Sequence, residues 1–103
     1  MPEYNIEILS EAEADINNAV AFYEDQQEGL GRRLLDQLTT DIRRLKNNCG
    51  IHARYFGTYR SLVQRFPYAI YYDMKSNTIR VIAVLDCRQH PSATIERLKH
   101  RRP

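Results

Sequence analysis

Three runs of apolar and β-branched residues follow one another between residues 58 and 91, with only turn signals between them. The runs comprise residues 59–66, 68–74 and 79–85. The first stops at Pro67, which cannot donate a ladder hydrogen bond, and in the second every other residue from Tyr68 to Met74 falls on one face. Because parallel pairing needs a crossover of about a dozen residues or more, this spacing predicts a three-stranded antiparallel meander.

The residues before the meander predict a short strand and a first helix. Tyr4, Ile6 and Ile8 alternate with polar residues, which is typical of a strand. Ser10 and Glu13 then have the spacing of a capping box at the start of a helix. The apolar stripe of that helix has the spacing i, i+3, i+4 and i+7, and it consists of Ile16, Ala19, Val20 and Tyr23.

A second helix is predicted from about Arg32 to Lys46, after the glycine-containing turn at residues 26–31. Its stripe consists of Leu34, Leu35, Leu38, Ile42 and Leu45. Basic residues gather in its last turn, where the helix dipole favours cations. Residues 51–57 are expected to form a loop. Pro91 suits the first turn of a terminal helix that covers about residues 92–100.

Together these elements predict one α+β domain over residues 1–103. Two antiparallel helices lie on one face of an antiparallel sheet of about four strands, in the order β-α-α-β-β-β, followed by a short C-terminal helix. The first strand returns to the sheet across the helix hairpin, beside the last strand. A chain of 103 residues is long enough to build this core without disulfides or metals.

Composition narrows the class of protein further. No apolar run reaches the roughly 20 residues that span a bilayer, and the first nine residues lack the basic start of a signal peptide. Cys49 and Cys87 stand alone, as expected of reduced thiols in a cytoplasmic protein. His52, His90 and His100 are scattered, so we expect no metal site and no cofactor.

Charge is divided unevenly along the chain. Residues 1–31 carry eight acidic and no basic side chains, whereas residues 32–103 carry all 15 basic and five acidic ones. Such a division favours a basic surface that meets a nucleic acid or an acidic protein. The alternative is that the two halves neutralise each other within the fold.

Arginines near the meander are the strongest candidates for a binding site. Arg60, Arg65, Arg80 and Arg88 lie in or next to the predicted strands, where a guanidinium could bind phosphate or carboxylate with two hydrogen bonds. The alternative is pairing within the fold, with Asp73 or Asp86. The segment from Asp86 to His90 also places a thiol beside Arg and His, which could lower its pKa.

Nearly the whole chain resembles the RelE/ParE toxin superfamily, particularly the branch called plasmid stabilization proteins. The similarity lies in the S-x-x-E helix start, in GLGRRLLDQL, in YRSLVQRFPYAIYY and in VIAVLDCRQHP. The resemblance implies a two-helix hairpin on an antiparallel sheet. It also implies a toxin of a type II toxin–antitoxin system that a cognate antitoxin neutralises.

Members of this superfamily act on different targets: RelE-like toxins cleave mRNA on the ribosome, and ParE-like toxins inhibit DNA gyrase. RelE-type ribonucleases usually carry Arg where this chain has Ala69, and Tyr where it has Thr94. Asp86 replaces a family His and Gln89 a family Arg, while Arg88 and Pro91 are retained.

The resemblance therefore favours a gyrase-binding protein over an enzyme. The ribosome-dependent ribonuclease and an inactive, degenerate toxin stay open as alternatives. The residues expected to bind the target are Arg60, Arg65, Arg88 and His90, with no catalytic residue assigned. The expected partners are the antitoxin and gyrase, or the ribosome and mRNA in the alternative. The sequence also leaves open a homodimer.

Overall fold

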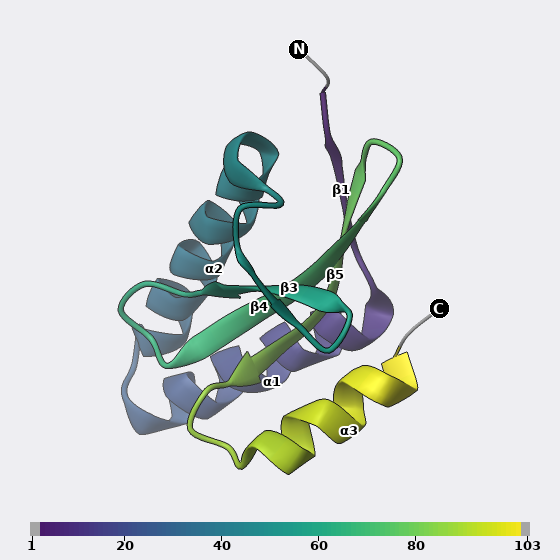
Figure 1. Ribbon diagram of the computed structural model, residues 1–103. Coiled ribbons are helices and arrows are strands. Elements are labelled where there is room, and N and C mark those ends of the chain that lie inside the picture. The colour runs from purple at the N-terminus through teal and green to yellow at the C-terminus, as the bar shows by residue number, and fades with distance from the viewer. Residues whose placement is uncertain (1–2, 102–103) are drawn as a thin grey trace.

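The computed structural model describes residues 3–101; residues 1–2 and 102–103 of the predicted domain lie outside the described residues. Its elements, in chain order, are β1 (Asn5–Ile8), α1 (Ser10–Gln26), α2 (Leu30–Asn48), β2 (Ala53–Tyr55), β3 (Thr58–Leu62), β4 (Tyr68–Lys75), β5 (Thr78–Asp86) and α3 (Pro91–Arg101). Figure 1 shows the α1–α2 hairpin beside the sheet and α3 apart from the hairpin, near the end of the chain. The predicted α+β class and the order of the elements are confirmed.

The sheet differs from the prediction in two details. It has five strands in the order β1-β5-β4-β3-β2, and β1 pairs with β5 in parallel, so the sheet is mixed. The predicted position of the first strand beside the last is confirmed, and its parallel direction is possible because the chain between β1 and β5, which includes both helices, is much longer than a parallel connection requires. The extra strand is β2, which pairs with β3 and lies in the segment predicted as a loop. Three residues are too few for a strand pattern to be recognised in the sequence.

The sheet is covered on both faces, with β4 at its centre. Tyr68, Ile70 and Tyr72 pack into the core beneath α1 and α2, as the alternation predicted. Ala69 and Tyr71, on the other face, are also buried and share a smaller core with Leu98 of α3. The C-terminal helix therefore covers part of the second face. Because β4 is buried on both faces, its sequence is a nearly continuous apolar run.

Helix starts depend on contacts that local spacing does not reveal. The predicted capping box is absent: α1 begins at Ser10 after Leu9, with no side-chain hydrogen bond at its cap. At α2 the cap comes from the preceding helix, because the Glu24 carboxylate accepts hydrogen bonds from the backbone N–H groups of Gly29 and Gly31 at 2.9 and 3.0 Å. Gly31 also marks the closest approach of the hairpin, where an added Cβ would lie 2.6 Å from the Val20 carbonyl oxygen.

The pairing of β1 with β5 ends at Val81. Beyond it, two side chains form hydrogen bonds with backbone groups on this edge of β5. The Asp15 carboxylate of α1 accepts a hydrogen bond from the Val84 N–H at 3.0 Å. Arg101 of α3 donates to the Ile82 carbonyl at 3.4 Å and forms a two-pronged ion pair with Asp15. This buried pair joins the first and last helices across the strand edge. It also neutralises part of the acidic N-terminal half within the fold.

Candidate functional site

Three of the four predicted target-binding residues lie at the same end of the sheet. Tyr68 pairs with Asp86, and the Cys87 N–H donates to the Pro67 carbonyl at 2.8 Å. These contacts place the β3–β4 turn, which contains Arg65, beside the β5–α3 loop, which contains Arg88 and His90. Arg60 lies apart from them, because its side chain is on the face of the sheet that α3 partly covers.

Arg60 is held by aromatic neighbours. Its Nε donates a hydrogen bond to the Tyr71 hydroxyl at 3.2 Å, and its guanidinium carbon lies 5.4 Å from the centre of the Tyr55 ring. Burial raises the pKa of the Tyr71 hydroxyl, so this group stays a neutral acceptor. The guanidinium is therefore fixed on the sheet, although it is only partly buried.

Arg88 and His90 organise the loop that leads into α3. Arg88 makes a two-pronged ion pair with Asp86 at 2.7 and 3.1 Å, and its hydrogen bonds hold the pKa of the Asp86 carboxyl below its usual value. Arg88 is nevertheless 63% exposed, so part of its guanidinium faces solvent. His90 caps α3, since its Nδ1 accepts the Ser92 N–H at 3.2 Å.

Arg80, in contrast, is an arginine paired within the fold. Its guanidinium binds the Asp73 carboxylate at 2.6 and 2.7 Å, directly across the β4–β5 ladder. Pairing with acids therefore accounts for Arg80 fully and for Arg88 in part. Arg65 has no such partner among residues 3–101, and it adopts a left-handed backbone conformation with φ of 71°.

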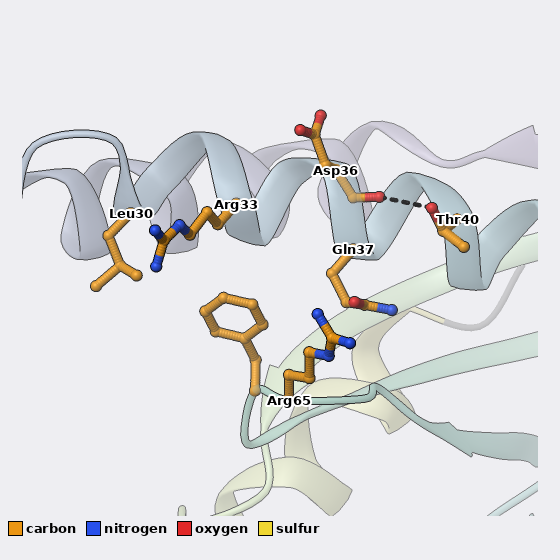
Figure 2. A pocket seen from close by; sticks show the side chains of 7 residues that line it. Leu30, Arg33, Asp36, Gln37, Thr40 and Arg65 are labelled. Carbon is orange, nitrogen blue, oxygen red and sulfur yellow. Dashed lines mark hydrogen bonds between the residues drawn. The ribbon is translucent and has the colours of Figure 1, made fainter.

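Two grooves flank α2 on opposite sides. The first, of about 570 Å³, lies between α2 and the β3–β4 turn and is called the arginine groove here (Figure 2). It is lined by Leu30, Arg33, Asp36, Gln37, Thr40, Arg65 and Phe66. The second, of about 500 Å³, lies between α2 and the edge strand β1 and is called the apolar groove. Its walls include Ile8, Ile16, Leu35, Leu38 and Ile42, with Arg43 and Lys46 at the rim.

Apart from Arg65, the residues that line these grooves were not assigned to a site from the sequence. Leu35 was predicted as part of the buried stripe of α2, yet it is 37% exposed, and Ile8 on β1 is 39% exposed. Both residues line the apolar groove. The apolar stripe of α2 is wide, which indicated that the sheet and α1 leave part of it uncovered. Only the position of β1 shows that Leu35 is the residue left exposed.

The positions that correspond to ribonuclease side chains are enclosed. Ala69 is fully buried and Thr94 is 4% exposed, on β4 and α3 respectively. Ala69 packs in the small core that includes Leu98. Neither side chain faces solvent, and neither carries a group that could move a proton at a 2′-hydroxyl.

His52 and Tyr72 connect the end of α2 to the sheet. The Tyr72 hydroxyl accepts the Gly50 N–H at 2.9 Å and lies 2.5 Å from His52 Nδ1. Burial lowers the pKa of His52 and raises that of Tyr72, so both side chains favour their neutral forms in the folded protein.

This lowered pKa predicts a loss of stability in mild acid. The unfolded chain takes up the His52 proton near pH 6.5, whereas the folded chain takes it up only at lower pH. Stability from this site is therefore complete above about pH 6.5 and declines as the pH falls through the lower folded pKa. Lowering the pH from about 7.5 to about 5.5 should reduce the free energy of unfolding more in the wild-type protein than in His52→Gln, whose side chain cannot titrate in this range. Urea unfolding at the two pH values measures both losses. An equal loss in both proteins would contradict the prediction.

Among residues 3–101 no group of three His, Cys, Asp or Glu side chains is placed to hold a metal ion, and both cysteines are free thiols. No helix of this described range is long and apolar enough to cross a membrane.

Comparison with known proteins gives a match among solved structures. No protein family model matches the chain, and no curated protein matches it significantly. Among solved structures, a chain from the chromosomal ParDE TA system of P. aeruginosa superimposes with a TM-score of 0.67 at 13% sequence identity. The superposition covers 84% of this chain and 98% of that chain. The two chains share a fold. The shared fold agrees with the fold that the resemblance implied.

Proposed function

We propose that the chain is the toxin of a type II toxin–antitoxin module, acts in the cytoplasm by binding DNA gyrase, and is neutralised by an acidic antitoxin. The observation that carries the proposal is the fold shared with a chain of a ParDE system over 84% of the residues. The resemblance of YRSLVQRFPYAIYY and VIAVLDCRQHP to the same superfamily supports it independently. A toxin that acts by binding needs a surface and no proton-transfer groups.

The enclosed positions of Ala69 and Thr94 favour gyrase over mRNA. RNA cleavage requires an acid–base pair near the 2′-hydroxyl and a cation near the developing phosphorane charge. Arg60 could supply the cation, but the aligned positions offer an alanine and a buried threonine in place of the family Arg and Tyr. Arg65, Arg88 and His90, at one end of the sheet, are the proposed contacts with the target, and Arg60 is a proposed contact on the other face.

The apolar groove is the proposed docking site of the antitoxin. Its walls expose Ile8 and Leu35, and its rim carries Arg43 and Lys46, which form no ion pair with residues 3–101. An amphipathic acidic segment would bury its apolar side chains between α2 and β1 and place its carboxylates at the rim. The groove and the rim charges therefore match one kind of occupant.

Expression in cells tests the proposed function. Induction of the chain should arrest growth, and co-expression of a small acidic protein from the adjacent reading frame should restore it. The purified complex should weaken as salt is raised, because rim charges are screened over about 8 Å at physiological ionic strength. Unimpaired growth, or no complex with the neighbouring protein, would contradict the proposal.

A further inference from the structure

Arg33 of α2 and Arg65 of the β3–β4 turn both line the arginine groove, with the Arg33 guanidinium beside Leu30 and the Arg65 guanidinium beneath Gln37 (Figure 2). The acid that lines this groove does not neutralise them. Asp36 turns its carboxylate away from the turn and pairs with Arg32 at 3.1 Å. The only other acidic or amide group that lines the groove is Gln37, which is uncharged. Two like charges therefore share one pocket without a counterion from its walls.

Both guanidinium groups are unpaired within the part of the chain that the structure describes. Neither Arg33 nor Arg65 takes part in an ion pair or a side-chain hydrogen bond there, whereas Arg32, Arg80 and Arg88 each bind a carboxylate. An arginine that the fold does not use is available to an external anion. Each of these two arginines can bind a carboxylate with charge-assisted hydrogen bonds.

Arg65 also has an unusual backbone conformation. A φ of 71° is the left-handed conformation, which glycine and asparagine adopt more readily than arginine. Arg65 is exposed and contributes no hydrogen bond to the described fold, so folding alone gives no reason for an arginine there. The turn conformation therefore places an exposed arginine side chain at the edge of the groove.

We infer that Arg33 and Arg65 bind acidic side chains of the toxin's protein target, while an apolar side chain of that target packs on Leu30 and Phe66. This inference rests on the proposed function and names the chemistry by which the target is recognised. A carboxylate presents two oxygens to a guanidinium group, and the same protein can supply the apolar side chain that packs on Leu30 and Phe66.

A nucleic acid fits this groove less well. Its phosphates repeat along each strand with a rise of about 3.4 Å, so a bound strand would also approach neighbouring acids. Asp36 is 65% exposed at the rim, and Glu28 lies exposed two residues before Leu30. These charges repel a polyanion but leave room for isolated carboxylates.

The arginine groove and the apolar groove lie on different sides of α2, which separates target binding from antitoxin binding. Arg33, Gln37 and Thr40 share one flank of the helix, and Leu35, Thr39 and Ile42 share the other. Arg65→Gly is the discriminating variant, since glycine suits the backbone at this position. Arg65→Asn also accepts this conformation and serves as a second variant.

With Arg65→Gly, we expect growth arrest to be lost and gyrase affinity to fall about ten- to hundred-fold, as for the loss of a hydrogen-bonded charge pair. The thermal midpoint should be unchanged or higher, and affinity for the antitoxin should stay unchanged. Arg33→Gln should weaken gyrase binding similarly. Lys75→Gln, which removes one exposed positive charge at the β4–β5 turn outside both grooves, is the control and should leave gyrase affinity unchanged.

A probe that needs neither gyrase nor the antitoxin tests the site by itself. In NMR titrations of the full chain, a model peptide of alternating Glu and Leu should shift the Arg33 and Arg65 Nε–H signals, and short single-stranded DNA should not. The inference would be overturned if the peptide caused no shifts, or if DNA caused shifts and the peptide did not. It would also be overturned by an Arg65→Gly variant that binds gyrase normally, or by one that loses affinity for the antitoxin and for gyrase together. If wild-type protein binds the peptide through these arginines yet neither arrests growth nor binds gyrase, the proposed function fails and the assignment to its target fails with it.

Discussion

Replacement of Arg101 by methionine should lower the free energy of unfolding by about 3 kcal/mol, because it leaves the Asp15 carboxylate buried without its cation. Asp15 and Arg101 are 8% and 11% exposed, and their two-pronged pair joins α1 to α3 beside β5. The Asp15 carboxylate keeps its hydrogen bond from Val84, so the loss should fall at the low end of the range for a broken buried pair. Urea unfolding at neutral pH, followed by circular dichroism, measures it.

A matched pair of variants isolates the buried charge. Arg97→Met changes an exposed arginine of the same helix and should cost less than about 0.5 kcal/mol. Asp15→Asn should cost less than Arg101→Met, because the amide oxygen can still accept the Val84 N–H and Arg101 keeps the Glu11 carboxylate at 3.5 Å. If Arg101→Met and Arg97→Met cost the same, the ion pair does not hold α3 on the sheet.

Leu35→Glu should weaken antitoxin binding by at least about a hundred-fold, as expected when an apolar contact at an interface centre is replaced by a charge. Leu35 lines the apolar groove and is 37% exposed, so the new carboxylate can reach water in the free protein. In the complex it would be buried against an acidic segment, where desolvation and like-charge repulsion both oppose binding.

The control for this prediction is Phe22→Glu. Phe22 lies on α1, is 53% exposed and does not line the apolar groove, so the same charge at this position should leave antitoxin affinity unchanged. Isothermal titration of each variant with the purified antitoxin gives the affinities, and thermal unfolding checks that both variants are folded. Equal weakening by the two substitutions, or none by Leu35→Glu, would place the antitoxin elsewhere.

The sequence predicts those parts of the fold in which local pattern and tertiary packing agree. The alternation in Tyr68 to Met74 places the core residues of β4 correctly, and Pro91 begins the terminal helix as expected. The first meander strand ends earlier than predicted, at Leu62 instead of Phe66, because the chain bends through the left-handed Arg65 before β4. An apolar run alone does not reveal such a bend.

Features that depend on distant contacts could not be predicted. The start of α2 is capped by Glu24 of the preceding helix, and the edge of β5 is satisfied by Asp15 and Arg101, which are 86 residues apart. The candidate site has the same origin. Arg33 and Arg65 are brought into one groove by the packing of α2 beside the β3–β4 turn, and nothing in their sequence spacing indicates it.

Arg60 and Arg88 show how much of the candidate site residue type alone can predict. Both were predicted as rigidly held guanidinium groups beside the meander, and the structure holds one on Tyr71 and the other on Asp86. Arg60 lies on β3, whereas Arg88 lies in the loop between β5 and α3, so their surroundings depend on tertiary contacts that residue type does not reveal.

A paired assay on one preparation tests most directly whether the chain acts by binding gyrase. Gyrase supercoiling of relaxed plasmid is measured beside translation of a reporter message, with primer extension along that message. We expect supercoiling to be blocked while the message stays intact, because Ala69 and Thr94 replace the groups that a ribonuclease of this superfamily would use and loss of an acid–base group costs about 10²–10⁴ in rate. Discrete cuts within codons at sub-stoichiometric protein, with supercoiling unaffected, would contradict the account, and inactivity in both assays would identify a degenerate toxin.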